Sequence, residues 1–442
     1  MGYPRVKPLR ASLHTLGCRL NQTDTGLMAD DLRRHGYEVV PWGQEAELLV
    51  VNGCSVTGSA TQKTGQCVRA ARRRFPDAFI VLAGCPVDVG REGGGLESGA
   101  DVLLPNAVKT KISAALPEIL ARTGHLVGGV DSPAGKSDGF TEDGCGYYPE
   151  RTRANVKIQE GCDFSCSYCI VPKARGPARS REWNDVLREL RELVGNGHRE
   201  IVLTGVNIAT YLDHGRDLAD LLEEICGLAG EFRVRLSSTE PGAVLHRIID
   251  IMGMTPRVCR FLHLPIQYGE ERILELMRRP YSIGEFRSLL DHSTGSIPGV
   301  CVGSDVIVGF PGETEEIFDQ CVRTIEELKF HYLHVFTYSV RPGTKAARMP
   351  DQVPGPIAAA RHRRLSEVAR GQSMVFAEAH VGKKLVVLTE SRMDNTSVEG
   401  WSDNYLRARI HDPEGGIPLN EFVAVEVLGC VSGRGVSARA AE

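Results

Sequence analysis

The sequence predicts an α/β protein of three domains, in which a central series of strand–helix units is flanked by a smaller parallel α/β domain and a small all-β domain. The chain has 442 residues, which corresponds to about three domains of typical size, and its 42% hydrophobic content is sufficient for several cores. Apolar runs rich in β-forming residues alternate with helical patterns over most of the chain, an order that favours parallel sheets. Short β-type runs separated by turn residues follow, as in a small antiparallel barrel.

The first domain, residues 1–125, is predicted to contain an open parallel sheet. Its strand-like runs lie at residues 9–16, 47–52 and 78–83. Each run leads to a glycine followed by a cysteine, in the pairs Gly17–Cys18, Gly53–Cys54 and Gly84–Cys85. Because parallel strands bring their carboxyl ends to the edge at which open α/β sheets bind ligands, we expect the three thiols to converge. They form a candidate site for an iron–sulfur cluster. The alternative is that each cysteine is a small buried side chain.

Residues 126–150 are rich in Gly, Asp, Ser and Pro and have no periodic pattern, which is typical of a linker. We expect this linker to let the first domain face the second, residues 151–379. In the second domain, strand-like runs lie at residues 155–161, 200–205, 232–239, 260–266, 300–310 and 332–338. Helical patterns such as 183–194 and 313–328 separate them, so six repeats predict a complete or partial (β/α)6 barrel. In such barrels the active site lies where the strands end.

The loop after the first of these strands carries three cysteines in the spacing C-x3-C-x2-C: Cys162, Cys166 and Cys169. Thiolates select soft metals and iron–sulfur clusters, and a cluster held by three protein sulfurs leaves one iron open to an outside ligand. A zinc site typically adds a second cysteine pair, and a ferredoxin run adds a fourth cysteine nearby. The next cysteine here is Cys226, so the spacing favours a three-cysteine cluster, with zinc or plain buried thiols as alternatives.

The last domain, residues 380–442, has β-type runs at 384–389, 405–410 and 421–428 between Gly, Asp and Asn turns, which suits a small barrel of a kind that commonly binds nucleic acid. From residue 381 onward there are seven basic and nine acidic residues, so a β-domain without that role stays an alternative. By contrast, residues 151–181 hold seven basic and two acidic residues. That excess places positive charge beside the cysteine loop, where it suits a polyanionic substrate or the carboxylate of a cofactor.

The sequence predicts a cytoplasmic enzyme with no membrane contact. No apolar segment resembles a signal peptide, and no window approaches the roughly 18 uninterrupted apolar residues of a spanning helix. In a reducing compartment, 13 cysteines favour metal binding over disulfides. The net charge of −4 gives no global attraction to nucleic acid, so any such contact must come from local basic patches.

Taken together, the motifs resemble those of the radical S-adenosylmethionine (radical SAM) methylthiotransferases over essentially the whole chain. The matching motifs are Cys162-x3-Cys166-x2-Cys169, Thr204-Gly205-Val206-Asn207, Gly309-Phe310-Pro311-Gly312-Glu313-Thr314 and Tyr338-Ser339-x-Arg341-Pro342-Gly343-Thr344. The resemblance implies a flavodoxin-like first domain with an auxiliary cluster, a radical-SAM partial (β/α)6 barrel, and a small antiparallel barrel called a TRAM domain, which usually binds RNA. These three blocks follow in the order given above.

The resemblance also implies the cofactors, which are two [4Fe–4S] clusters and S-adenosylmethionine. One cluster would be held by Cys162, Cys166 and Cys169, and the auxiliary one by Cys18, Cys54 and Cys85. S-adenosylmethionine would bind the open iron of the first, and its 5′-deoxyadenosyl radical would abstract hydrogen from C2 of a modified adenine, so no side chain is expected to act as the catalytic group. The candidate cofactor contacts are Tyr168, Thr204, Gly205, Asn207, Glu240 and Gln267, although each of them can instead cap a turn or pair with backbone. A flavodoxin or ferredoxin is the expected electron donor.

Within the family, residues 15–22 and 52–57 are most similar to the branch that acts on N6-threonylcarbamoyladenosine at position 37 of tRNA, next to the anticodon. Unstacked loop bases suit RNA recognition of this kind. The alternatives are a branch acting on isopentenyladenosine in tRNA or on a ribosomal-protein aspartate, a two-cluster electron carrier, and a zinc-dependent RNA-binding module. Two residues depart from the usual pattern: Gly53 stands in place of Thr, and Tyr268, in place of Ser, is expected to reshape the substrate mouth.

Overall fold

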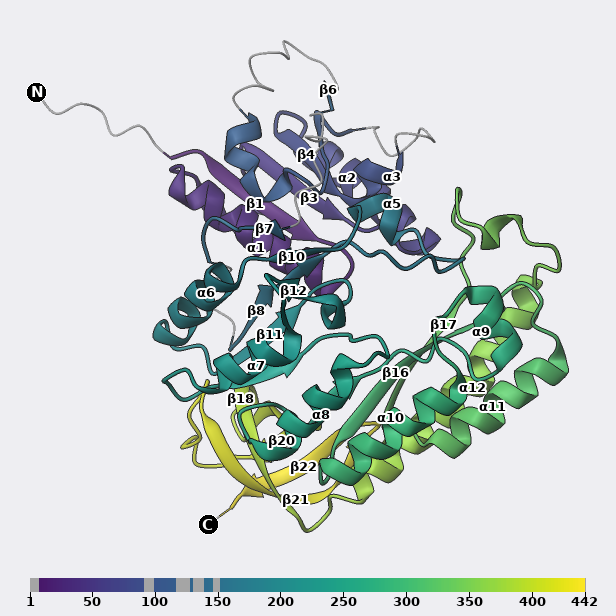
Figure 1. Ribbon diagram of the computed structural model, residues 1–442. Coiled ribbons are helices and arrows are strands. Elements are labelled where there is room, and N and C mark those ends of the chain that lie inside the picture. The colour runs from purple at the N-terminus through teal and green to yellow at the C-terminus, as the bar shows by residue number, and fades with distance from the viewer. Residues whose placement is uncertain (1–7, 91–98, 117–127, 130–138, 146–151, 442) are drawn as a thin grey trace, which may run out of the picture.

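A computed structural model describes residues 8–90, 99–116, 128–129, 139–145 and 152–441. The amino-terminal α/β domain, the central strand–helix domain and the carboxyl-terminal barrel follow one another along the molecule (Figure 1). The fold class predicted from the sequence is confirmed: an amino-terminal parallel sheet, a central domain of parallel strands, and a small closed barrel. Among the described helices, none is long and apolar enough to cross a membrane.

The amino-terminal sheet is parallel throughout, in the order β2-β1-β3-β4-β5-β6. Its strands are β1 (Arg10–Thr15), β2 (Glu38–Val40), β3 (Leu48–Gly53), β4 (Phe79–Gly84), β5 (Val102–Leu104) and β6 (Gly128–Gly129). The central strand β3 is buried along its whole length, as expected for a parallel strand covered on both faces. Helices α1 (Arg19–Arg34) and α2 (Gly58–Arg74) follow the strands. The short strands β2, β5 and β6 escaped sequence analysis because two or three residues make no periodic pattern.

Most of the predicted linker, residues 126–150, lies outside the described residues. Two described pieces of it join sheets: β6 pairs with β5, and β7 (Gly139–Phe140) pairs with β10 (Arg179–Arg181) in the central domain. This segment is therefore tied to both neighbouring domains by backbone hydrogen bonds.

Six parallel strands form the central domain in two sheets of three. The first sheet contains β8 (Arg153–Lys157), β11 (Glu200–Thr204) and β14 (Arg233–Leu236), and the second contains β15 (Phe261–His263), β16 (Cys301–Val308) and β17 (Tyr332–Thr337). Single parallel bridges, one of them between Ser238 and His263, join the sheets across β14 and β15. The result is the predicted partial barrel, in which all six strands end on one side.

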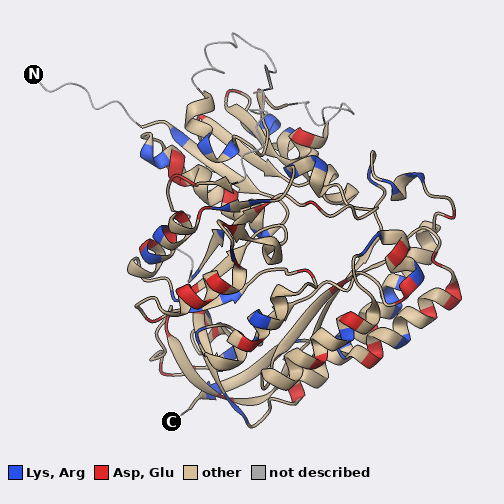
Figure 2. Ribbon diagram, viewed as in Figure 1, with Lys and Arg blue, Asp and Glu red and all other residues tan. Residues whose placement is uncertain are grey.

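Helices cover the outside of this sheet. They are α6 (Trp183–Gly195), α7 (Leu218–Cys226), α8 (Val244–Met254), α9 (Glu271–Met277), α10 (Ile283–Ser296), α11 (Glu315–Leu328) and α12 (Gly355–Glu378). Local side chains fix where several of them begin: Asp217 and Ser282 each accept hydrogen bonds from the first turn of a helix, α7 and α10, in a reciprocal capping box. Lys, Arg, Asp and Glu are mixed along the outer helices α10, α11 and α12 rather than gathered by sign (Figure 2).

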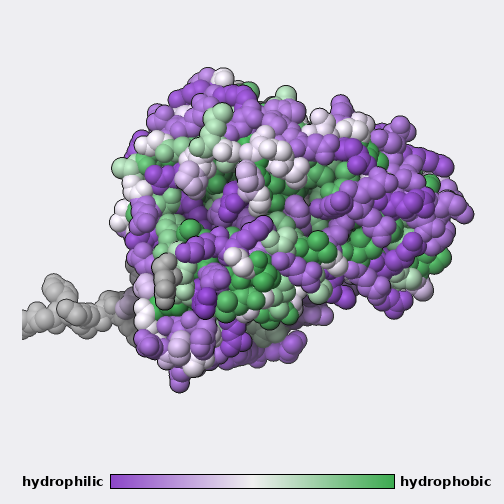
Figure 3. All heavy atoms as spheres, turned by 90° about the horizontal axis from the view of Figure 1, so that it is seen from below, coloured by the Kyte–Doolittle hydropathy of each residue, from purple (hydrophilic) through white to green (hydrophobic). Residues whose placement is uncertain are grey.

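The carboxyl-terminal barrel has five strands, two more than the sequence patterns predicted. They are β18 (Lys384–Asp394), β19 (Ser397–Ser402), β20 (Arg407–His411), β21 (Phe422–Ser432) and β22 (Gly435–Ala440), closed in the order β18-β19-β20-β22-β21. Four pairings are antiparallel, and β20 pairs with β22 in parallel, so the barrel is not wholly antiparallel. The view from below shows a largely hydrophilic surface on which apolar side chains gather in patches (Figure 3).

Buried arginines fix the barrel against the central domain. Glu200 accepts hydrogen bonds from Arg233 and Arg235, and these guanidinium groups also donate to the backbone carbonyls of Trp401 and Ser402 in the barrel. Arg260 pairs with Asp403 at 2.6 Å. Burial raises the pKa of Glu200, but the two arginines outweigh that effect and hold it well below its usual value. These arginines therefore join the central domain to the barrel.

The structure corrects the expected excess of positive charge at residues 151–181. Lys157, Arg175 and Arg181 are buried and paired with acidic side chains: Asp24 pairs with Lys157 and Arg175, and Glu189 pairs with Arg181. The local excess of positive charge is therefore largely neutralised inside the fold, although Arg175 reaches the wall of the main cavity described below.

Candidate active site

Three cysteines distant in sequence meet at the carboxyl edge of the amino-terminal sheet. Cys18 occupies the position just before α1, Cys54 follows β3, and Cys85 begins the short helix α3 (Cys85–Gly90) directly after β4. All three line one cavity of about 480 Å³, the main cavity. Burial raises the pKa of the Cys54 thiol to about 11, and the neighbouring Cys18 and Cys85 add to that rise. These thiols are therefore close enough to influence one another.

A glycine makes this approach possible. Gly17 has a φ of +101°, in the left-handed region, and a Cβ at this position would lie 2.5 Å from the Cβ of Cys54 and 2.8 Å from its Sγ. The amide of Asn21 donates to the carbonyls of Leu16 and Gly53 at 2.8 and 2.7 Å, which ties the two cysteine loops together. Backbone freedom and one buried amide thus set the spacing of the thiols.

The second set of cysteines lies on the loop after the two-residue strand β9 (Gln159–Glu160), and its members are Cys162, Cys166 and Cys169. An N–H group is directed at each sulfur. The backbone N–H groups of Phe164 and Val171 donate to the first and third sulfurs at 3.4 Å, and Nη1 of Arg279 donates to the second at 3.0 Å. Hydrogen bonds to sulfur are among the features by which proteins adjust iron–sulfur clusters, so this loop fits such a centre.

The thiols need a cation if they are to ionise. Burial raises the pKa of Cys54 to about 11 and that of Cys169 to about 12, so both are protonated at neutral pH in the absence of a metal. Coordination to a soft metal releases the thiol proton and compensates the buried charge. Sulfur-only donor sets of this kind match iron–sulfur clusters better than hard cations.

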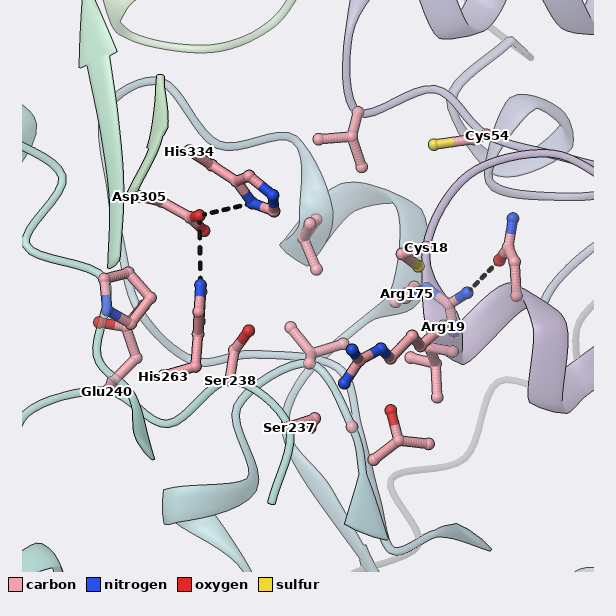
Figure 4. Close-up of a pocket in the computed structure, with 18 of the residues that line it drawn as sticks. Cys18, Arg19, Cys54, Arg175, Ser237, Ser238, Glu240, His263, Asp305 and His334 are labelled. Carbon is pink, nitrogen blue, oxygen red and sulfur yellow. Dashed lines mark hydrogen bonds and ion pairs between the residues drawn. The ribbon is translucent and has the colours of Figure 1, made fainter. Parts of the chain in front are cut away.

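Two adjoining cavities connect the two sets of cysteines. The main cavity contains the first set, and a smaller cavity of about 240 Å³ contains Cys169. Both cavities share four lining residues, Val56, Ile170, Gln267 and Asp305. In Figure 4, Cys18 and Cys54 lie on one side of the main cavity, and residues from the strands of the central domain face them from the other.

The residues expected to bind S-adenosylmethionine are divided between these walls. Four line the main cavity, namely Thr204, Gly205, Glu240 and Gln267. Tyr168 lines the smaller cavity together with Gln267. Asn207 lies behind the wall: it is 2% exposed, and its side-chain oxygen accepts a hydrogen bond from the backbone N–H of Glu240 at 3.3 Å. Its observed contact is therefore one that positions the Glu240 loop.

Sequence analysis missed Arg279 at this site. Its guanidinium group contacts both Glu240 and the sulfur of Cys166, and it packs against the ring of Tyr281. Burial lowers the pKa of Arg279, but the neighbouring Tyr168, Tyr281 and Cys166 outweigh this and raise it, so the side chain remains charged. The basic run around residue 279 gives no pattern that distinguishes one buried arginine from exposed ones.

The two departures from the family pattern have different consequences. A Cβ on Gly53 would lie 2.6 Å from the methyl group of Thr64 and 2.7 Å from the Pro86 ring, so these neighbours occupy the space that a threonine would need. Tyr268 is fully buried in the core of the central domain and lines neither of the two cavities. The expectation that it reshapes the substrate mouth is wrong, because its ring fills core volume instead.

Comparisons with known proteins first define the class. The Radical SAM superfamily matches residues 156–325, and Uncharacterized protein family UPF0004 matches residues 10–99. The radical S-adenosylmethionine methyltransferase TsrM from Kitasatospora setae, solved with cobalamin and a [4Fe–4S] cluster bound, superimposes with a TM-score of 0.57 at 16% identity, over 77% of each chain. That similarity shows the fold, and membership of the superfamily implies a [4Fe–4S] cluster and S-adenosylmethionine.

Curated relatives identify the family within this superfamily. The threonylcarbamoyladenosine tRNA methylthiotransferase MtaB of Bacillus subtilis (strain 168) is 34% identical over 94% of this chain and 93% of its own. The tRNA-2-methylthio-N(6)-dimethylallyladenosine synthase of Aeromonas salmonicida (strain A449) is 33% identical over 89% of this chain and 84% of its own. The chain belongs to the radical SAM methylthiotransferase family.

Proposed function

We propose that this enzyme inserts a methylthio group at C2 of N6-threonylcarbamoyladenosine at position 37 of tRNA. The geometry that carries the proposal is the pair of adjoining cavities, one lined by Cys18, Cys54 and Cys85 and the other by Cys169. Methylthiolation requires radical generation and sulfur donation at one substrate atom, and two cysteine sets facing connected cavities suit that requirement. Similarity to relatives named for threonylcarbamoyladenosine supports the choice of substrate.

In this proposal the chain's own residues bind and orient the cofactors and exclude water from them. Cys162, Cys166 and Cys169 hold the radical-SAM [4Fe–4S] cluster, and Cys18, Cys54 and Cys85 hold an auxiliary [4Fe–4S] cluster. When bound, the clusters and S-adenosylmethionine supply the reductive bond cleavage and sulfur chemistry that no side chain performs. Thr204, Gly205, Glu240, Gln267 and Tyr168 contact S-adenosylmethionine, and Asn207 fixes the Glu240 loop.

Each domain has its own role in the proposed reaction. Residues 1–125 carry the auxiliary cluster, residues 126–150 link them to the radical-SAM core at 151–379, and residues 380–442 form the TRAM domain that binds the anticodon loop of tRNA. A flavodoxin or ferredoxin delivers the electron in the cytoplasm. The net charge of the TRAM segment gives little general attraction to phosphate, so we expect tRNA binding to depend on all three domains.

Loss of one nucleoside tests the substrate. In a strain lacking this protein, mass spectrometry of tRNA nucleosides is expected to show that 2-methylthio-N6-threonylcarbamoyladenosine disappears while its unmethylthiolated precursor accumulates. The second candidate substrate is N6-isopentenyladenosine, also called N6-dimethylallyladenosine, because relatives named for it are similar to this chain. If the threonylcarbamoyl product persists and the 2-methylthio-isopentenyl product is lost, the proposed substrate is wrong.

Iron content tests the two clusters. After anaerobic reconstitution we expect about eight irons per chain, from two four-iron clusters. Replacing Cys18, Cys54 and Cys85 together by alanine is expected to leave about four irons and the ability to cleave S-adenosylmethionine under dithionite. Replacing Cys162, Cys166 and Cys169 is expected to leave about four irons without that cleavage. Tetrahedral zinc in place of iron would support the RNA-binding module, and eight irons without cleavage would support an electron carrier.

A further inference from the structure

Three titratable side chains form a cluster on the wall of the main cavity, opposite the first set of cysteines (Figure 4). They are His263 on β15, Asp305 on β16 and His334 on β17. Oδ1 of Asp305 lies 3.3 Å from Nε2 of His263 and 3.4 Å from Nδ1 of His334. We name these three residues the His–Asp–His cluster. Family motifs used in sequence analysis did not include any of them.

Strand register places the cluster. Gly303 of β16 pairs with His263 on one side and with Tyr332 on the other, and Asp305, two residues further along the same face, pairs with His334. A Cβ on Gly303 would lie 3.0 Å from the ring of Tyr332 and 3.2 Å from that of His263. The glycine therefore makes room for two aromatic rings beside the carboxylate, and the hydroxyl of Tyr332 contacts the remaining ring nitrogen of His334.

The cluster has unused hydrogen-bonding capacity. His263 is 8% exposed, and its Nδ1 has no hydrogen-bond partner among the described residues. Within the described part of the chain, Oδ1 of Asp305 accepts no hydrogen bond of good geometry, and Oγ of Ser237, on the wall of the same cavity, also has none. Burial raises the pKa of Asp305, but the two histidines outweigh this and keep it well below its usual value, so the carboxylate is an acceptor. Buried polar atoms without partners are unfavourable unless a bound ligand completes them.

We propose that the His–Asp–His cluster binds the polar threonylcarbamoyl group of the target adenosine and selects it over an apolar dimethylallyl group. This inference rests on the proposed function. The threonylcarbamoyl group carries N–H and O–H donors, which suit the carboxylate of Asp305. It also carries carbonyl and carboxylate oxygens, which suit an N–H group at Nδ1 of His263. His334, whose two ring nitrogens contact Asp305 and Tyr332, holds the Asp305 carboxylate in place. Asp305 lines both cavities, so a base that reaches both sets of cysteines passes this wall.

Binding of an apolar substituent against the same wall would be unfavourable in free energy. It would exclude water from the carboxylate and the imidazoles without replacing the lost hydrogen bonds. Sites built to hydrogen-bond a substrate reject analogues that lack the polar group by large factors, because the buried groups of the site are left unpaired. Discrimination by this cluster is therefore expected to act mainly against the dimethylallyl substrate.

The test uses two synthetic anticodon stem–loop RNAs of identical sequence, one carrying N6-threonylcarbamoyladenosine and the other N6-isopentenyladenosine. Phosphate contacts are the same for both RNAs, so the ratio of their kcat/KM values and the ratio of their Kd values isolate the N6 substituent. The variants are Asp305→Asn and His334→Gln in reconstituted holoenzyme; the His334 side chain is 47% exposed, so its replacement disturbs the core little. Matched controls are Asp250→Asn and His292→Gln, an exposed His–Asp pair on α8 and α10.

We expect the wild-type enzyme to prefer the threonylcarbamoyl RNA. Asp305→Asn removes the charged acceptor and His334→Gln removes the ring that holds it in place, so each cluster variant is expected to lower that preference by about tenfold or more. The control variants are expected to keep the wild-type ratio. Equal loss for both RNAs would make the cluster structural and overturn the inference. Two imidazoles and a carboxylate also suit a transition-metal cation, so a stoichiometric cation found by metal analysis in wild type and lost in Asp305→Asn would overturn it as well.

Failure of this inference is distinguishable from failure of the proposed function. If wild type modifies the threonylcarbamoyl RNA and the variants keep the full preference, only the role of the cluster is wrong. If wild type modifies the isopentenyl RNA instead, the proposed substrate is wrong, and the inference fails with it.

Discussion

Alanine in place of Gly161 is expected to prevent assembly of the cluster on the 162–169 loop. Gly161 has a φ of +70°, and a Cβ there would lie 1.9 Å from the carbonyl oxygen of Pro177 and 2.6 Å from its carbonyl carbon. Both are backbone atoms of the turn whose Gly176 carbonyl accepts the N–H of Cys162 at 3.1 Å. Relieving the overlap must therefore separate the two backbone segments that hold the first cysteine in place.

Iron analysis measures this effect directly. In the Gly161→Ala variant we expect iron to fall from about eight to about four per chain, with S-adenosylmethionine cleavage lost. The four irons of the auxiliary site report that the amino-terminal domain is still folded. Gly215→Ala is the matched control, because Gly215 also has a positive φ, +82°, but its Cβ would meet no atom of the described residues within 4 Å. The control is expected to cost about 1–2 kcal/mol of stability and no iron. Eight irons in Gly161→Ala would show that the loop tolerates the displacement.

The sequence was sufficient for features that are local or periodic. Strands β1, β3 and β4, and the six strands of the central domain, were predicted because each lies within a run of β-forming residues in the sequence that is long enough to recognise. The spacing of Cys162, Cys166 and Cys169 placed them on one loop for the same reason, since three nearby positions need no tertiary fold to bring them together. The short strands β19 and β22 were missed because turn residues and small side chains interrupt their alternation.

Contacts between residues that are far apart in the sequence could not be predicted from local or periodic patterns. Arg279 contacts Cys166 from 113 positions away in the chain, and no periodic pattern predicts such a pairing. Asp305 and His334 meet because their strands are adjacent in one particular register, which depends on the whole barrel. The charge at residues 151–181 was overestimated because one of its buried acidic partners, Asp24, lies in another domain.

Asparagine in place of Asp24 is expected to destabilise the protein by about 3–5 kcal/mol, the usual result of removing one partner from a buried ion cluster. The Asp24 side chain on α1 is fully buried, and its carboxylate lies 2.7 Å from Nζ of Lys109, 3.0 Å from Nζ of Lys157 and 3.3 Å from Nη2 of Arg175. Glu142 and Glu160 are the other two buried acids that pair with Lys157. Three cations and three anions therefore balance, and the substitution leaves one buried positive charge without compensation.

The position of this ion cluster makes the expected effect larger than that of a surface pair. Lys109 belongs to the amino-terminal domain, whereas Lys157 and Arg175 belong to the central domain, so Asp24 joins the parts of the chain that carry the two sets of cysteines. At roughly 2–4 °C per kcal/mol for domains of this size, Tm is expected to fall by about 10 °C. Asp77→Asn, the same substitution at an exposed position of the same domain, is expected to stay within about 0.5 kcal/mol of wild type.

The pH dependence of the unfolding free energy distinguishes loss of the Asp24 charge from a change in packing. Burial raises the pKa of Asp24, but the three cations outweigh this and hold the pKa far below its ordinary value. A carboxyl group with a depressed pKa in the folded state contributes stability that is present above the pKa of the unfolded state, about 4, and is lost as the pH falls towards the pKa of the folded state. The wild-type advantage in unfolding free energy over Asp24→Asn is therefore expected to be constant from about pH 8 to 5 and to shrink below about pH 4. An advantage that persists unchanged in acid would show that the carboxylate acts through packing rather than through its charge.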